Sequence, residues 1–162
     1  MEWAEALMAG RELDVIRRTF NEFGKANGFR RKDSSLYRDT FDLQQLLRLQ
    51  RPGQGTAYFL NVELLLFRGL NGQAAESQAP QISWRIQDFL KTSGPLVVKM
   101  LDLATPIDDG DRITALTGLL GDADKRLSRL RTLEEVRQRG LGEPIGRVRR
   151  EAYQLLDLTP GS

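Results

Sequence analysis

The side chains that could do chemistry in this sequence are polar residues set into apolar segments, because the usual catalytic residue types are missing. Cysteine and histidine do not occur, which excludes thiolate nucleophiles, disulfide bonds, imidazole acid–base chemistry and the usual zinc sites. The remaining residues show no spacing typical of a nucleophile with its base or of a set of metal ligands. We therefore predict that the protein is not an enzyme and uses no metal and no cofactor.

Neutral amides and arginines inside apolar strands are the better candidates for a binding site. Gln50 and Asn61 each interrupt an apolar segment, and a buried amide must find hydrogen-bond partners. A few convergent polar groups in an apolar setting mark a ligand site, whereas a purely structural network is the alternative interpretation. The residues proposed for ligand or partner binding are Tyr37, Arg38, Gln50, Asn61 and Arg85.

Basic residues are dense near the C-terminus. Nine basic residues and three acidic ones lie between Lys125 and Arg150. A basic helical face can neutralise phosphates, while the simpler interpretation is a solvated helix surface. No aromatic residue is interleaved with them, which argues against a platform for stacking single-stranded bases. The residues of the nucleic-acid alternative are Arg129, Arg137, Arg147 and Arg150.

Two smaller charged groups have structural interpretations. The acidic group from Asp108 to Asp111 lacks the spacing of a calcium loop, and Asp111 is interpreted as the N-cap of a helix over 112–120. Lys25 and the basic residues at 30–32 lie beside a glycine that opens a strand rather than a helix. We interpret this second group as the charged edge of a sheet.

The segment around which the fold is organised is 56–67, where apolar side chains occupy every second position. This alternation predicts a central strand with Asn61 and Glu63 on its less apolar face. Further strands are predicted at 29–32, 35–40, 43–50 and 82–90, and their short connections predict an antiparallel meander. Segment 69–79 is predicted to be a surface loop.

Helices are predicted on both sides of these strands. Apolar residues recur every three or four positions over 2–26, which predicts one amphipathic helix that covers the sheet and ends near Gly24 and Asn27. Segment 96–103 fits a helix or a strand. Beyond it we expect helices over 112–120 and from Asp122 to about 130, a capping box at Thr132 and Glu135, and a last helix after Gly142.

The fold class that follows is α+β. We expect an antiparallel sheet of four to five strands covered by an N-terminal helix, followed by a C-terminal helical segment. The 162 residues suit a single domain over 1–162, with the helix and sheet in 1–95 and a mainly helical part in 96–162. No apolar run approaches the ~20 residues of a membrane helix, so the protein is predicted to be cytoplasmic with no membrane contact.

Segment 23–62 resembles a bacterial family, domain-of-unknown-function family 4304. The residues that carry the resemblance are Gly28-Phe29 followed by basic residues, Tyr37-Arg38, a strand ending at Leu49-Gln50, and Asn61-Val62 in an aromatic strand, with Arg85-Ile86 as a weaker echo. The resemblance implies a small bacterial α+β domain. It implies no activity and no catalytic residues.

These observations favour a non-catalytic module that binds another protein, as a regulator or an immunity-like factor. The alternative is an accessory protein that contacts nucleic-acid phosphates through its C-terminal arginines. An enzyme is the third hypothesis, and it would require a deep pocket that holds Asn61, Glu63 and Arg85 together.

Overall fold

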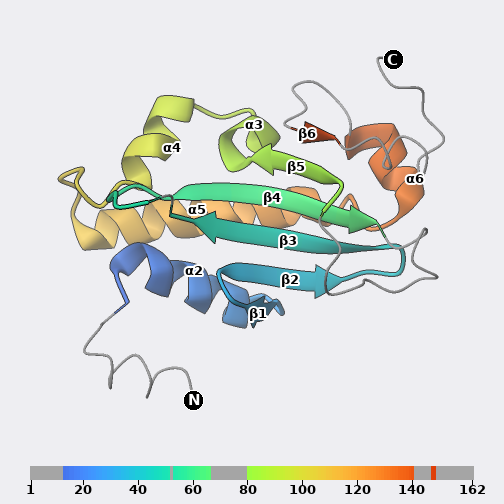
Figure 1. Cartoon of the computed structure of the whole chain (residues 1–162), viewed down its shortest axis with the longest axis horizontal. Coiled ribbons are helices and arrows are strands. Elements are labelled where there is room, and N and C mark those ends of the chain that lie inside the picture. Colours follow the sequence, from blue (N-terminus) through green and yellow to red (C-terminus); the bar gives the residue numbers. More distant parts are fainter. Residues whose placement is uncertain (1–12, 52, 67–79, 141–146, 149–162) are drawn as a thin grey trace.

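The structure is a computed structural model, and it describes residues 13–51, 53–66, 80–140 and 147–148. Six strands in these ranges form one sheet whose order follows the chain, and each neighbouring pair is antiparallel. Helices lie against one face of that sheet (Figure 1). The chain therefore has the predicted α+β fold, with an antiparallel meander and helices at both ends.

The five predicted strands are all present. The first hairpin joins β1 (Arg30–Lys32) to β2 (Ser35–Asp39), and the second joins β3 (Leu43–Gln50) to β4 (Phe59–Leu66). The fifth strand is β5 (Ile82–Arg85), which pairs with β4. The alternating segment is thus an interior strand between β3 and β5, as its apolar pattern predicts.

The predicted strand over 82–90 is wrong beyond Arg85, because the chain turns there into helix α3 (Ile86–Leu90). Ile86 and Phe89 are the buried residues of this helix, and their spacing of three puts both on one helical face. Since Ile86 also continues the alternation of β5, the period alone could not locate the boundary.

A sixth strand was not predicted. β6 (Arg147–Val148) pairs with β5, where Val148 lies opposite Ile82. The predicted last helix after Gly142 is therefore wrong at these two residues, and the rest of it lies outside the described residues, as does the predicted loop at 69–79. Pairing with an open sheet edge satisfies backbone groups of both strands and can override a helical pattern.

The N-terminal helix is shorter than predicted. α2 (Val15–Ala26) begins after Asp14, whose Oδ1 accepts a hydrogen bond from the backbone N–H of Arg17 at 2.9 Å. The extended backbone of Asp14 rules out one continuous helix from residue 2, and residues 1–12 lie outside the described part. Gly24 is inside the helix, which ends at Ala26 with Asn27 as its C-cap, so the predicted end of the helix is correct.

The C-terminal half holds a short helix, α4 (Gly94–Met100), and a long one, α5 (Asp109–Leu127). The first resolves most of the ambiguous segment 96–103 as helix. The second replaces the two helices predicted there, and its N-cap is Asp108 rather than Asp111. The charged residues at 122–126 are compatible with a helix interior, so a polar residue there is a weak signal of a new start.

The N-cap bond of the predicted capping box is present at α6 (Leu133–Glu135), whereas Oε1 of Glu135 accepts from the backbone N–H of Arg131 rather than from that of Thr132. The Oγ1 atom of Thr132 accepts a hydrogen bond from the backbone N–H of Glu135 at 3.1 Å. A π-helical turn over Val136–Gly140 follows.

The core lies between one face of the sheet and helices α2 and α5. Alternate strand residues such as Leu47 and Val62 are fully buried there, against Phe20 of α2 and Leu120 of α5. None of the helices in the described ranges is long and apolar enough to span a membrane. Since the helices use only one face of the sheet, the second face is where polar strand residues gather.

Candidate functional site

The second face of the sheet carries a hollow of about 400 Å³ on β3, β4, β5 and the start of α3. The strand register places its side chains next to one another, because Asn61 lies opposite both Arg48 and Arg85, while Glu63 lies opposite Ser83. We call this the sheet-face hollow. Its lining includes Arg48, Gln50, Asn61, Glu63, Ser83, Trp84, Arg85 and Asp88.

Three of these residues form a chain of hydrogen bonds across the strands. The Nη1 atom of Arg85 donates to Oδ1 of Asn61 at 2.8 Å, and Nδ2 of Asn61 donates to Oε1 of Gln50 at 3.3 Å. A guanidinium has only donors, so Asn61 must turn its oxygen toward Arg85 and its nitrogen toward Gln50. The orientation of both amides therefore follows from the arginine, and the chain ends with the Nε2 group of Gln50.

The guanidinium of Arg85 is held in place by an aromatic ring. Its central carbon lies 4.1 Å from the ring centroid of Phe59, in the range of a cation–π contact. Arg85 is half-buried, and within the described residues it makes no salt bridge, even to Asp88 on the rim of the same hollow. The guanidinium of Arg85 is thus a positioned positive charge in the hollow that no carboxylate of the described residues neutralises.

The second arginine of the hollow is neutralised. The Nη2 atom of Arg48 lies 2.9 Å from Oε1 of Glu63, a close charge contact that lacks hydrogen-bond geometry. Glu63 is only 3% exposed, and its Oε2 accepts a hydrogen bond from Oγ of Ser83 at 3.1 Å. A buried carboxylate needs such partners, so Arg48 and Ser83 are explained by the burial of Glu63.

The structure brings together three of the five predicted site residues, namely Gln50, Asn61 and Arg85. Tyr37 is on the same face of the sheet but packs against Leu46 and Leu65, outside the hollow. Arg38 is the next residue along β2 and therefore points to the opposite face. There it donates to Gln45 and forms a salt bridge with Asp124 of α5.

The sequence positions of Arg48 and Ser83 could have predicted that both residues belong to the site. Each lies two positions from a predicted site residue on the same strand, Arg48 before Gln50 and Ser83 before Arg85. Residues two apart on a strand share a face, so each strand contributes a pair. Only the register between strands shows that these pairs meet.

The described arginines of the nucleic-acid alternative lie on different elements. Arg129 follows α5 and is exposed, and Arg137 donates a hydrogen bond to Glu134. That bond is the main reason why the pKa of Glu134 lies below its ordinary value. Arg147 belongs to β6, and Arg150 lies outside the described residues.

An exposed aromatic residue stands beside this basic segment. Phe41, at the tip of the hairpin between β2 and β3, is 90% exposed. Its two neighbours anchor the tip, since Oγ1 of Thr40 donates to the carbonyl oxygen of Arg131 at 2.7 Å and Oδ2 of Asp42 accepts from the backbone N–H of Leu133 at 2.9 Å. The sequence separates these residues by about ninety positions, which is why no aromatic residue was expected there.

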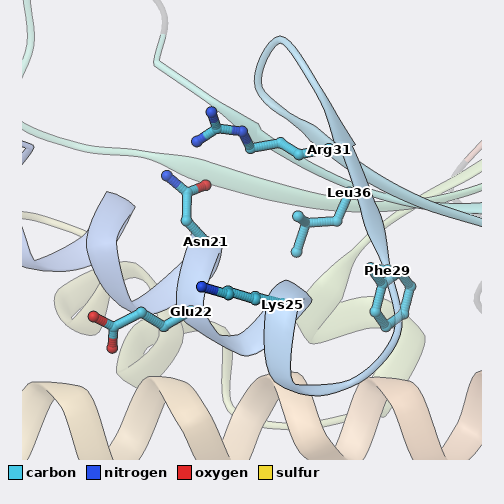
Figure 2. Close-up of a pocket in the computed structure, with 6 residues that line it drawn as sticks. All are labelled: Asn21, Glu22, Lys25, Phe29, Arg31 and Leu36. Atoms are coloured by element: carbon cyan, nitrogen blue, oxygen red, sulfur yellow. The ribbon is translucent and has the colours of Figure 1, made fainter. Parts of the chain in front are cut away.

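A second hollow, of about 320 Å³, lies between α2 and the first hairpin. Figure 2 shows its helix side, with Asn21, Glu22 and Lys25, and its hairpin side, with Phe29, Arg31 and Leu36. The charged groups there are exposed and of both signs, and the buried residues are apolar. Because none of the described residues that line this hollow is both polar and buried, the sheet-face hollow is the better candidate for a binding site.

Comparison with protein-family models, with curated proteins and with solved structures gives no match for this chain. The resemblance to family 4304 therefore stays a prediction from the sequence.

Proposed function

We propose that this protein is a non-catalytic binding module that engages a partner protein through the sheet-face hollow. The observation that carries the proposal is the hydrogen-bond chain from Arg85 through Asn61 to Gln50. It fixes two donor groups on an accessible face of a rigid sheet. Groups that are already ordered cost little conformational entropy when a partner binds, so they make effective contacts.

The chemistry of the hollow supports binding rather than catalysis. Among its described lining residues, the one hydrogen-bonded pair of a hydroxyl and a carboxylate is Ser83 with Glu63, and the carboxylate is also in contact with Arg48. A nucleophile needs a base that is free to accept its proton and a third group that orients this base. Here the carboxylate is buried and serves as the counter-charge of an arginine, which is a structural arrangement.

The biological setting that we propose is regulatory or immunity-like, in the cytoplasm of a bacterium. The bacterial origin rests on the family resemblance, and the cytoplasm on a sequence in which no apolar run approaches the ~20 residues of a membrane helix.

The test is site-specific photo-cross-linking in the native cytoplasm. A photoreactive residue replaces Gln50 in the hollow, and in a control it replaces Asp122, which is exposed on α5. We expect a discrete protein adduct from position 50 that is absent from position 122 and is reduced when Arg85→Gln is added. Equal adducts from both positions, or none from position 50, would contradict the proposal.

The nucleic-acid alternative gains one observation from the structure, which is the position of Phe41 next to Arg131 and Leu133. An exposed aromatic ring beside basic side chains can stack an unpaired base. If this function is correct, single-stranded RNA should bind with a steep salt dependence, and Phe41→Ala should weaken binding more than Leu96→Ala, which removes an exposed leucine of α4. Equal effects of the two changes would reject it.

A further inference from the structure

We propose further that the group bound in the sheet-face hollow is a carboxylate, supplied by an acidic side chain of the partner protein. This inference rests on the proposed function and specifies the chemistry of its contact. It follows from the direction of the hydrogen bonds in the hollow.

The sheet-face hollow presents unused hydrogen-bond donors to a ligand. Arg85 uses Nη1 on Asn61, and the remaining N–H groups of its fork have no partner among the contacts of the described residues. Gln50 accepts from Asn61 through Oε1, which leaves its Nε2 group unused in the same part of the chain. Both side chains line the hollow, and Gln50 is exposed.

The acceptors of the hollow are largely occupied. Oδ1 of Asn61 accepts from Arg85, and Oε1 of Gln50 accepts from Asn61. The buried carboxylate of Glu63 is held by Arg48 and Ser83. The exceptions are Asp88, which is exposed on the rim, and Oε1 of Glu63, which is buried and accepts no hydrogen bond from the described residues. A ligand that only donates, such as the ammonium of a lysine, therefore finds few acceptors and meets the positive charge of Arg85.

The charges favour a carboxylate over a phosphate. Arg48 and Glu63 neutralise each other, and the charges of the hollow that form no salt bridge within the described residues are Arg85 and the exposed Asp88 on the rim. One planar anion with a single negative charge matches one guanidinium fork. A phosphate dianion would bring a second negative charge close to Asp88 and Glu63, and the described lining of the hollow offers no second free arginine to compensate it.

The experiment is a nuclear magnetic resonance titration of the full chain with matched peptides. The probes are acetyl-Ala-Glu-Ala-amide, the same peptide with Gln, the same peptide with Lys, and inorganic phosphate. The signals are the Nε–H of Arg85 and the side-chain amides of Gln50 and Asn61. For a single carboxylate contact we expect a dissociation constant on the order of 10 mM.

We expect the Glu peptide to shift these three signals and to bind at least about fivefold more tightly than the Gln peptide, since a charge-assisted bond is replaced by a neutral one. The Lys peptide should give no shift there. Equal binding of the Glu and Gln peptides, tighter binding of the Lys peptide or of phosphate, or shifts at other sites would overturn the inference.

Variants test whether Arg85 is the residue that binds. Arg85→Gln should abolish the response to the Glu peptide, and Arg85→Lys should weaken it several-fold because a point charge replaces a planar fork. The matched control is Arg18→Gln, which removes an exposed arginine from α2 and changes the net charge equally. Loss of binding in the control as well would show non-specific attraction and would reject the site.

The two proposals fail in different ways. If position 50 cross-links a partner but the Glu peptide does not bind, the partner site stands and the carboxylate inference is wrong. If the Glu peptide binds but no protein is cross-linked, the hollow binds carboxylates of another source, and the protein-binding function is wrong.

Discussion

Arg38 of β2 and Asp124 of α5 form a salt bridge across 86 residues of sequence, with Nη2 of the arginine 2.7 Å from Oδ1 of the aspartate. The same guanidinium donates to Oε1 of Gln45, whose amide nitrogen in turn donates to the carbonyl oxygens of Leu127 and Leu130. Arg38 was predicted to be a binding residue. It instead connects β2 to the C-terminal part of α5.

We expect Asp124→Asn to lower the free energy of unfolding by about 1 kcal/mol, because the pair is only about one quarter exposed and its aspartate is a hydrogen-bond acceptor. The control is Asp122→Asn, an exposed position on the same helix. Urea unfolding at neutral pH measures both. Equal effects at the two positions would mean that the salt bridge contributes nothing measurable.

The contact between Arg48 and Glu63 should be more important for stability than its partial exposure suggests. Arg48→Ala leaves the carboxylate of Glu63, which is 3% exposed, with Ser83 as its remaining partner, and we expect a loss of about 1–3 kcal/mol. Arg30→Ala, at an exposed position of β1, should change the stability by less than about 0.5 kcal/mol.

A double variant checks the cause. Adding Glu63→Gln to Arg48→Ala removes the uncompensated charge and should recover part of the stability. If the double variant is less stable than Arg48→Ala alone, the loss comes from packing of the arginine stem rather than from the charge.

Gly24 is required by close packing between α2 and the sheet. A Cβ atom at this position would lie 2.5 Å from Cδ2 and 2.7 Å from Cδ1 of Leu36, a side chain that is only 1% exposed. We expect Gly24→Ala to destabilise the protein by about 1–3 kcal/mol, despite the helix preference of alanine.

Gly118 of α5 offers the matched control, since a Cβ atom there would meet nothing within 4 Å. Gly118→Ala should stabilise the protein by up to about 1 kcal/mol through helix propensity alone. Thermal or urea unfolding of both variants gives the comparison. The packing argument fails if both alanines change the stability in the same direction.

Tyr58 should make stability depend on alkaline pH. Its hydroxyl donates to Oδ2 of Asp14 at 2.5 Å, and burial, followed by the interaction with Asp14, raises the pKa of this phenol above its ordinary value. The unfolded chain loses the phenol proton near pH 10, whereas the folded chain keeps it to higher pH. This stabilisation is therefore fully present below about pH 10 and is lost as pH rises through the folded pKa.

We expect Tyr58→Phe to cost about 1 kcal/mol at pH 8, through loss of the hydrogen bond, and to show a shallower decline of stability above about pH 10. Urea unfolding at a series of pH values measures both effects. Tyr37→Phe, on the other face of the sheet, should retain the steeper decline. Parallel pH profiles for the wild type and Tyr58→Phe would contradict this assignment.

Local patterns in the sequence were sufficient for most of the elements. The alternation over 56–67 predicted an interior strand, and the short connections predicted the meander, because side-chain direction along a strand depends only on position in the chain. The capping box at Thr132 and Glu135 was equally local. The predicted boundaries were wrong where a residue fits both the strand period and the helix period, as Ile86 does. They were also wrong where a polar residue fits both an N-cap and a helix interior, as at Asp111 and Asp122.

The candidate site was predictable only in part. The sequence shows that polar residues interrupt the apolar strands at Gln50, Asn61 and Arg85. That they meet depends on the register of β3, β4 and β5, which is a relation between segments and not a property of any one of them. Tyr37 and Arg38 are neighbours in sequence, and the pleat of the strand sends them to opposite faces.

The sequence by itself determined the α+β class, the central strand, and the absence of cysteine and histidine chemistry, because composition and short-range periodicity act within a few residues. The tertiary structure alone decided that β6 pairs with β5, that Arg38 binds α5, and that Arg85 orients two amides into a donor-lined hollow. These facts depend on strand pairing and packing between distant segments, and local propensity carries no information about such long-range contacts.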